Sequence, residues 1–192
     1  PIVFMFSGAA SHYPGMAVEL HASEPVFRQH LDRGLALLEK RTGQAFRSIL
    51  LPDVTGPDAA NALAAADEAM KQTSVQLPII FLVEYALAQL WMSWGIKPDL
   101  MIGHSLGENT AACIAGVLKF EDALDLLILR GKLTQSAQEG AMTSVNLPAA
   151  ALEPLLEGEC DLALVNAPEL CVAAGSPSAI EALEKRLADR EV

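Results

Sequence analysis

Apolar residues occur along the chain either in short continuous runs or at helical spacing, and this alternation is typical of an α/β protein. The runs at residues 2–6 and 99–102 are each followed by a turn that contains glycine, which predicts two strands of a parallel sheet, the first of them buried and central. Helices are expected at residues 24–42, 79–94, 109–115 and 121–138, with a loop and a short surface helix at 51–74.

The pattern changes after Gly140. Strands are expected at residues 141–147, 161–165 and 170–174, with helices at 149–156 and from 178 to the end. Ser178 and Glu181 have the spacing of a capping box. This β-α-β-β-α order lacks the last strand of a ferredoxin-like unit. We therefore expect a hydrolase-like parallel sheet in residues 1–138 and an inserted ferredoxin-like lobe, incomplete at its C-terminal end, in 139–192.

The composition excludes several classes of protein. Of the 192 residues, 52% are hydrophobic and 19% are charged, which excludes a disordered chain. The net charge of −11 argues against a nucleic-acid partner. The apolar run at 79–94 is too short and too interrupted to span a bilayer, and no secretion signal opens the chain. Cys113, Cys160 and Cys171 lack metal-binding spacing. We expect a cytoplasmic protein with no membrane partner and no metal site.

Residues 103–107 have the sequence Gly-His-Ser-Leu-Gly and lie between an apolar strand and a helix-forming run. A G-x-S-x-G sequence in this setting is typical of a nucleophile elbow, in which glycines allow a turn tight enough to expose the serine hydroxyl. The same sequence also occurs as a simple turn with a helix cap. The flanking strand and helix favour the elbow, and Ser105 is the candidate nucleophile.

Further residues are candidates for the same site. In serine-elbow folds the oxyanion hole uses one N–H from a loop after an early strand and one from the residue after the nucleophile, here Ala9 and Leu106. A plain surface loop is the alternative for Ala9. Arg130 lies on or beside the apolar face of its helix, where its charge needs either a carboxylate of the protein or one of a substrate. Gln76, just before the helix at 79–94, either faces a pocket or serves as a cap or surface residue.

A serine nucleophile also needs a base, which in hydrolase-like folds is a histidine that follows the serine in chain order. The histidines of this chain are His12, His21, His30 and His104, and none follows Ser105. His104 directly precedes the serine, and neighbouring side chains of a strand point to opposite faces. We expect either a base beyond Val192 or a chain that is not an active enzyme by itself.

An ordered set of motifs extends over nearly the whole chain, and the set is far more specific than any one of them. The motifs are Phe6-Ser7-Gly8, Tyr13-Pro14-Gly15-Met16, Gln76, Leu87-Ala88-Gln89-Leu90-Trp91, Gly103 to Glu108, Arg130-Gly131, Gly140-Ala141-Met142 and Val165-Asn166-Ala167-Pro168. Together they resemble the first two-thirds of a malonyl-CoA:acyl-carrier-protein transacylase, most closely the acyltransferase domain of a modular type I polyketide synthase.

The resemblance implies that Ser105 attacks an extender-unit CoA thioester and passes the acyl group through an acyl-enzyme to the phosphopantetheine thiol of an acyl carrier protein. It implies that the N–H groups of Ala9 and Leu106 stabilise the oxyanion and that Arg130 binds the free carboxylate of a malonyl-type unit. Gln76 and His104 are expected to line the substrate site. No bound cofactor is implied, and the expected partners are the carrier protein and the neighbouring ketosynthase and linker of a multidomain synthase.

The chain departs from the family at several positions. The family usually has glutamine at Ala9, glycine at Ala10 and an aromatic residue at Asn109, and its catalytic histidine follows the small lobe. Leu106 favours a malonyl over a methylmalonyl unit. Ala9 and the missing histidine keep open an impaired or truncated remnant that acts as a binding or scaffold module. A serine thioesterase or hydrolase is the other alternative, against which Arg130 argues.

Overall fold

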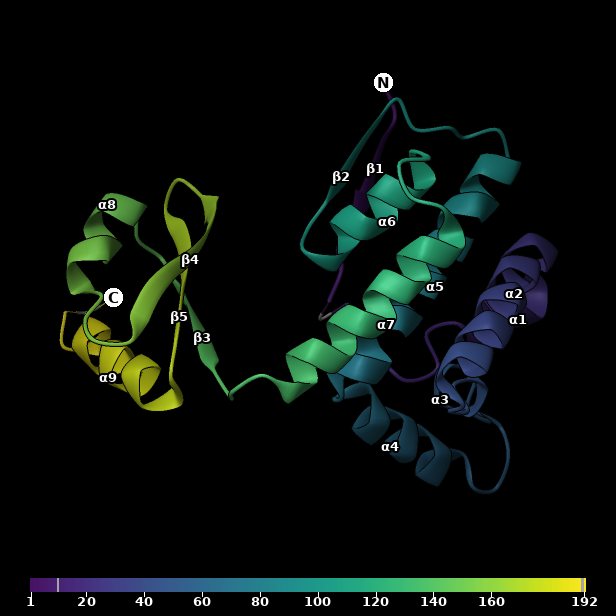
Figure 1. Ribbon diagram of the computed structural model, residues 1–192, viewed down its shortest axis with the longest axis horizontal. Coiled ribbons are helices and arrows are strands. Elements are labelled where there is room, and N and C mark those ends of the chain that lie inside the picture. The colour runs from purple at the N-terminus through teal and green to yellow at the C-terminus, as the bar shows by residue number, and fades with distance from the viewer. Residues whose placement is uncertain (10, 191) are drawn as a thin grey trace. The chain divides into compact units, whose positions relative to one another are not determined.

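The computed structural model describes residues 1–9, 11–190 and 192, which form two units, Pro1–Ser136 and Ala137–Val192. In the first unit, two short strands lie beside α6 (Leu106–Ile114) at the edge of a group of helices (Figure 1). The strands are β1 (Val3–Phe6) and β2 (Leu100–Gly103). The helices are α1 (Val18–Ser23), α2 (Pro25–Thr42), α3 (Arg47–Leu50), α4 (Ala59–Met70), α5 (Thr73–Ser93), α6 (Leu106–Ile114) and α7 (Phe120–Ser136).

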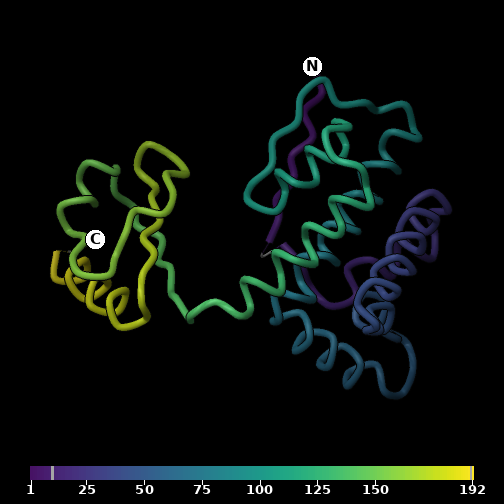
Figure 2. Tube along the Cα trace, in the orientation of Figure 1, coloured from purple at the N-terminus to yellow at the C-terminus, as the bar shows by residue number. Residues whose placement is uncertain are grey.

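The two strands lie side by side although they are far apart in the sequence (Figure 2). They pair in parallel, with Phe6 opposite Gly103. The prediction that the first strand is buried is wrong, since Met5 is 78% exposed, and Leu100 of the second strand is 62% exposed. Alternate residues of a strand face opposite sides, and here one side of the pair is exposed while Phe6 on the other side is buried. The apolar runs predicted both strands, but they did not indicate whether one or both faces of the strand pair are covered by other elements.

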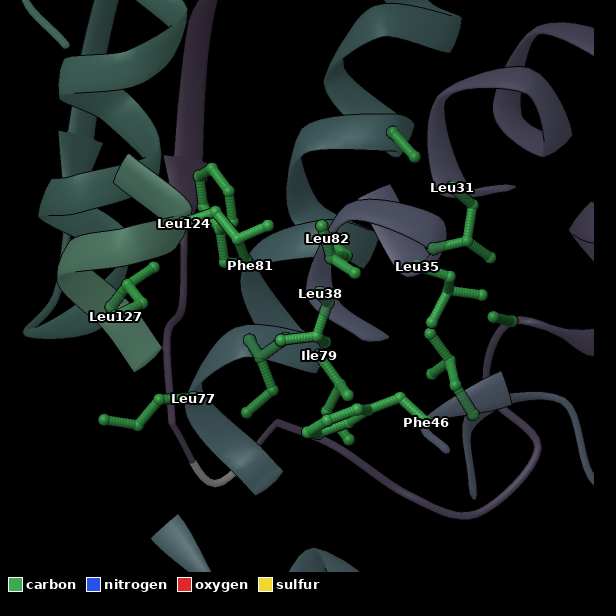
Figure 3. Packing of buried hydrophobic residues seen from close by; sticks show 14 of the residues in the cluster. Leu31, Leu35, Leu38, Phe46, Leu77, Ile79, Phe81, Leu82, Leu124 and Leu127 are labelled. Carbon is green, nitrogen blue, oxygen red and sulfur yellow. The ribbon is translucent and has the colours of Figure 1, made fainter. Parts of the chain in front are cut away.

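Helix α5 is the centre of the first unit. In Figure 3 its residues Phe81 and Leu82 lie between leucines of α2 and leucines of α7. By length and composition α5 could cross a membrane, but 56% of the relevant window is buried within the protein. Burial of this kind is what a core helix of a globular domain shows.

The helix is longer than the pattern predicts, because it begins at Thr73 and includes Pro78. Gln76 therefore lies in its first turn instead of before it, and the N–H of Gln76 donates to the carbonyl of Gln72 at 2.8 Å. Proline removes only its own N–H donor, so the turn that precedes Pro78 still forms. The short helices α1 and α3 were not predicted.

The second unit contains an antiparallel sheet of three strands in the order β3-β5-β4 with helices beside it (Figure 1). Its elements are β3 (Ala141–Val145), α8 (Ala149–Leu152), a 3₁₀ turn (Glu153–Leu155), β4 (Cys160–Ala167), β5 (Leu170–Gly175) and α9 (Pro177–Ala188). The predicted capping box is wrong, because α9 starts at Pro177 with Ser176 as its N-cap, and Ser176 makes no side-chain capping bond. Pro177 fits the first helical position, where its missing N–H has no intrahelical acceptor.

Candidate active site

Ser105 lies in a strained turn between β2 and α6. Its φ is 52° and its ψ is −110°, and it is the one residue other than glycine with positive φ among the described residues. Such a conformation is costly for a residue with a side chain and persists where the surrounding structure enforces it, as at a nucleophile elbow. The Ser105 side chain is exposed at the start of α6.

The glycines of the motif are required by close backbone contacts. A Cβ on Gly107 would overlap the carbonyl of Phe6, and a Cβ on Gly103 would overlap the backbone of Gly107 and Glu108. The missing side chains allow β1, β2 and the first turn of α6 to approach one another closely. The N–H of His104 also donates to the Phe6 carbonyl at 3.0 Å, which joins the elbow to the end of β1.

The loop after β1 lies against the elbow. Gly8 has a φ of 70°, and a Cβ there would overlap the His104 carbonyl and lie 3.4 Å from the Leu106 nitrogen. Ala9 follows Gly8 and packs, partly buried, against the core. Leu106 is the first residue of α6, so its N–H has no intrahelical acceptor. Both residues predicted for the oxyanion hole therefore lie next to the serine turn, while Ala10 lies outside the described residues.

Glu84 of α5 joins this loop to α6, a role that its place within an apolar run did not indicate. One carboxylate oxygen accepts a hydrogen bond from the Gly8 N–H at 2.9 Å, and the other accepts one from the Thr110 hydroxyl at 2.6 Å. Burial raises the pKa of Glu84, and the two hydrogen bonds partly oppose that shift. The available signal was a single carboxylate within the apolar stripe of a core helix.

Arg130 of α7 contacts the candidate nucleophile directly. Its Nη2 donates to the Ser105 Oγ at 2.9 Å, and its Nη1 donates to the Asn109 Oδ1 at 3.0 Å. Arg130 takes part in none of the ion pairs found among the described residues. The guanidinium is thus held by neutral oxygens, and its charge is available to an anion. Asn109 had been noted only as a departure from the family.

Gln76 contacts His12 of the first loop. The Gln76 Nε2 lies 3.2 Å from Nε2 and 3.4 Å from Nδ1 of the His12 ring. An amide nitrogen at similar distances from both ring nitrogens lies over the face of the imidazole. This contact links the first turn of α5 to the loop that carries Ala9.

None of the histidines forms a hydrogen bond with the Ser105 hydroxyl among the described residues. His21 bonds to Asp32, His30 packs edge-on against Tyr85, and the side chain of His104 is exposed. Burial lowers the pKa of His30, and the nearby Arg33 lowers it further. In the same described part of the chain, no three His, Cys, Asp or Glu side chains are grouped to hold a metal ion.

An elbow serine after a parallel strand, with an arginine on its hydroxyl, fits an acyl-transferring protein, and comparison with known proteins agrees. Residues 3–192 match the acyl transferase domain family, and the chain belongs to that family. It is 36% identical over 186 residues to mycoketide-CoA synthase of Mycobacterium tuberculosis, covering 96% of this chain and 4% of that protein. It is 37% identical over 183 residues to the spectinabilin polyketide synthase system protein NorB of Streptomyces orinoci, covering 93% of this chain and 8% of that protein.

Solved structures give the same result. The acyl transferase domain of ZmaA superposes with a TM-score of 0.89 at 38% identity, covering 100% of this chain and 44% of that one. The protein named MCAT from Streptococcus pneumoniae superposes with a TM-score of 0.81 at 26% identity, covering 99% of this chain and 60% of that one. The predicted family and the α/β class with a parallel sheet are confirmed. The chain thus belongs to the acyl transferase domain family and is similar to polyketide synthases, and it spans less than half of the ZmaA domain structure.

Proposed function

We propose that this domain transfers a malonyl-type acyl group from CoA to the phosphopantetheine thiol of an acyl carrier protein through a Ser105 ester. The observation that carries the proposal is the pairing of a strained, exposed serine with an uncompensated guanidinium on its hydroxyl oxygen. The serine supplies a nucleophile, and the guanidinium supplies a site for an anion next to it.

In the acylation step, Ser105 Oγ forms a bond to the thioester carbon while its proton passes to a base. The carbonyl oxygen becomes an oxyanion, for which the N–H groups of Ala9 and Leu106 are the proposed donors. The C–S bond then breaks, and the CoA sulfur leaves as a thiol with the proton returned by the base. In the second step the thiol of the carrier protein attacks the carbonyl carbon of the Ser105 ester. A new thioester forms, the C–O bond to Ser105 breaks, and the proton from the thiol passes through the base to the serine oxygen.

The position of Arg130 favours an acyl group with a carboxylate close to the reacting carbonyl. In a malonyl thioester one CH₂ group separates the two carbons, so a guanidinium nitrogen 2.9 Å from Oγ is within reach of the carboxylate. Bidentate binding of a carboxylate suits the planar guanidinium. Gln76 and His104 are proposed to line the remainder of this site. Two structural relatives have malonyl in their names, an acyltransferase domain in complex with a substituted malonyl group and an acyl-carrier-protein S-malonyltransferase.

Because guanidinium groups only donate, the Ser105 oxygen accepts from Arg130, and its own proton is free to point to a base. We propose that this base is a histidine outside residues 1–192, so these residues alone would not turn over. The proposed surroundings are a multidomain synthase in the cytoplasm, with a carrier protein, a ketosynthase and a linker as neighbours and no bound cofactor.

Intact-protein mass spectrometry after incubation with malonyl-CoA tests the proposal. A malonyl adduct that maps to Ser105 and is absent from Ser105→Ala is expected, and the adduct should decay when a carrier protein with its phosphopantetheine is added. The test is made on the full protein that carries residues 1–192 and on these residues alone. Absence of an adduct from the full protein would favour a scaffold role, and decay in water at the same rate without carrier protein would favour a hydrolase.

A further inference from the structure

Asn109 lies one helical turn after Ser105, so both side chains are on the same side of α6. Arg130 of α7 bonds to both of them, through Nη1 to the Asn109 Oδ1 at 3.0 Å and through Nη2 to the Ser105 Oγ at 2.9 Å. The orientation of the guanidinium is thereby determined at both of its terminal nitrogens.

The chemistry of this contact fixes which atom of the amide faces the arginine. A guanidinium has donors only, so the amide must present its oxygen and turn its NH₂ group away. Both side chains are half-buried, which strengthens the bond relative to one in open water. An amide oxygen can orient a cation in this way without cancelling its charge.

A carboxylate at the same position would orient the guanidinium equally well but would also neutralise it. The six ion pairs among the described residues do not include Arg130, so the neutral partner leaves the full charge of Arg130 to an incoming anion. Asparagine and aspartate have nearly the same size and shape, so the difference between them at this site is a difference of charge.

From this geometry we infer that Asn109 is a positioning residue that makes the site selective for acyl groups with a free carboxylate. This inference rests on the proposed acyl transfer. Asn109 acts through Arg130: it directs the Nη2 side of the guanidinium toward Ser105 and keeps the positive charge uncompensated. The prediction is that the charge at position 109 determines the preference between carboxylated and uncharged acyl thioesters.

The experiment compares Asn109→Asp with Asn109→Leu, which has a similar size but no acceptor. The rate of Ser105 acylation is measured against the concentration of malonyl-CoA and of acetyl-CoA, using the full protein. Asn109→Asp should raise the half-saturating malonyl-CoA concentration roughly tenfold or more, as expected when a charged hydrogen-bond partner is lost to the substrate. Acylation by acetyl-CoA should change less than about twofold, because no cation is needed for it.

Asn109→Leu keeps the charge of Arg130 but releases its orientation. It should lower the maximal rate with malonyl-CoA more than it raises the half-saturating concentration. In an Arg130→Ala background neither substitution at position 109 should have a further effect on malonyl selectivity, since the residue through which they act is gone. Binding of malonyl-CoA to Ser105→Ala protein, measured by calorimetry with and without Asn109→Asp, gives a readout that does not depend on acylation.

The outcomes separate this inference from the proposed function. If Arg130→Ala slows acylation by malonyl-CoA and by acetyl-CoA equally, Arg130 does not bind the substrate carboxylate. The inferred effect of Asn109 on selectivity is then also wrong. A second outcome is that Arg130→Ala slows acylation by malonyl-CoA alone while Asn109→Asp slows acylation by malonyl-CoA and acetyl-CoA equally. In that case Asn109 is a structural residue, and only the present inference is overturned. Unchanged malonyl-CoA binding in the Ser105→Ala pair would overturn it as well.

Discussion

The Nη2 atom of Arg130 donates a hydrogen bond to the Oγ atom of Ser105 at 2.9 Å, which places a cation directly on the hydroxyl of the proposed nucleophile. An arginine in this position does not serve a general esterase, whose acyl groups carry no charge near the ester carbon. Under the proposed function it binds a substrate carboxylate that lies within two bonds of the reacting carbonyl.

We therefore expect Arg130→Ala to lower acylation by malonyl-CoA roughly ten- to a hundredfold, the usual effect of losing hydrogen bonds to a charged group. Acetyl-CoA should acylate Ser105 at an unchanged or higher rate, because the substitution enlarges the site and removes a cation that this donor does not use. Rates of adduct formation with the two thioesters provide the measurement. Arg130→Lys is the matched control, since it keeps the charge but loses the planar fork, and it should give an intermediate loss.

The close approach of Gly107 to Phe6 leads to a prediction about the stability of the fold. Replacing a glycine inside a helix with alanine normally stabilises a protein by about 0.5–1 kcal/mol. At Gly107 the added Cβ would overlap the Phe6 carbonyl, so Gly107→Ala should instead lower the free energy of unfolding by about 1–3 kcal/mol. Both tryptophans, Trp91 and Trp94, lie in the first unit, so tryptophan fluorescence during denaturation reports on this unit.

Gly43→Ala is the control for this substitution. Gly43 ends α2 with a φ of 71° and has no atom within 4 Å of an added Cβ, so alanine there meets a backbone cost and no overlap. The expected cost is about 1–2 kcal/mol, and Ser105 acylation should stay normal. Gly107→Ala should also slow acylation, because the elbow must shift to relieve the overlap. Normal acylation with full stability in Gly107→Ala would contradict the close contact.

The elbow could be predicted from the sequence because its determinants are local. Gly103, Ser105 and Gly107 lie within five residues, and the geometry of a sharp turn follows from that spacing. The partners of Arg130 could not be predicted, since they depend on how α7 packs on α6. A helical pattern indicates that an arginine lies beside an apolar face, but it does not identify the residue opposite.

Other parts of the fold escaped prediction for equally specific reasons. An apolar run has the same pattern whether one or both faces of a strand are covered, so the exposure of Met5 and Leu100 was not foreseen. The apolar stripe at 79–94 did not reveal the first residues of α5, which begins at Thr73 and includes Pro78. Glu84 is one of the polar residues that interrupt the apolar run at 79–94, and its two hydrogen bonds connect α5 with the loop after β1 and with α6.

Cys113 on α6 should be nearly inert toward alkylation in the folded protein. It is buried, and burial first and the nearby Glu121 second raise the pKa of its thiol from 9.0 to about 11. Because only the thiolate reacts, the reactive fraction at pH 8 is about 100-fold below that of an unperturbed thiol. Peptide mapping after timed iodoacetamide treatment should show slow labelling of Cys113 in the native protein and fast labelling in denaturant. Equal labelling in both conditions would contradict its burial.

Glu84 and Glu121 should affect the pH dependence of stability in opposite directions. The folded pKa of Glu84 is raised, chiefly by burial, so the folded protein binds a proton at Glu84 more tightly than the unfolded chain does. The contribution of Glu84 to the free energy of unfolding is fully present below the unfolded pKa of 4.5. It is lost as the pH rises through the raised pKa of the folded protein. The folded pKa of Glu121 is lowered by a hydrogen bond from its own backbone N–H and by Arg33, so its contribution is present above 4.5 and is lost as the pH falls through the lowered value.

Denaturation followed by tryptophan fluorescence between pH 3 and pH 8 distinguishes the contributions of Glu84 and Glu121 to stability. The difference in unfolding free energy, wild type minus Glu84→Gln, should fall as the pH rises above 4.5, since glutamine cannot ionise. The same difference for Glu121→Gln should fall as the pH drops below 4.5. Because Glu84 also holds the Gly8 N–H beside Ala9, Glu84→Gln should slow Ser105 acylation by malonyl and acetyl donors alike, whereas Glu121→Gln should leave both unchanged. If Glu84→Gln slowed acylation by malonyl-CoA alone, Glu84 would be connected to carboxylate binding, and its proposed role in holding the loop that carries Ala9 would be wrong.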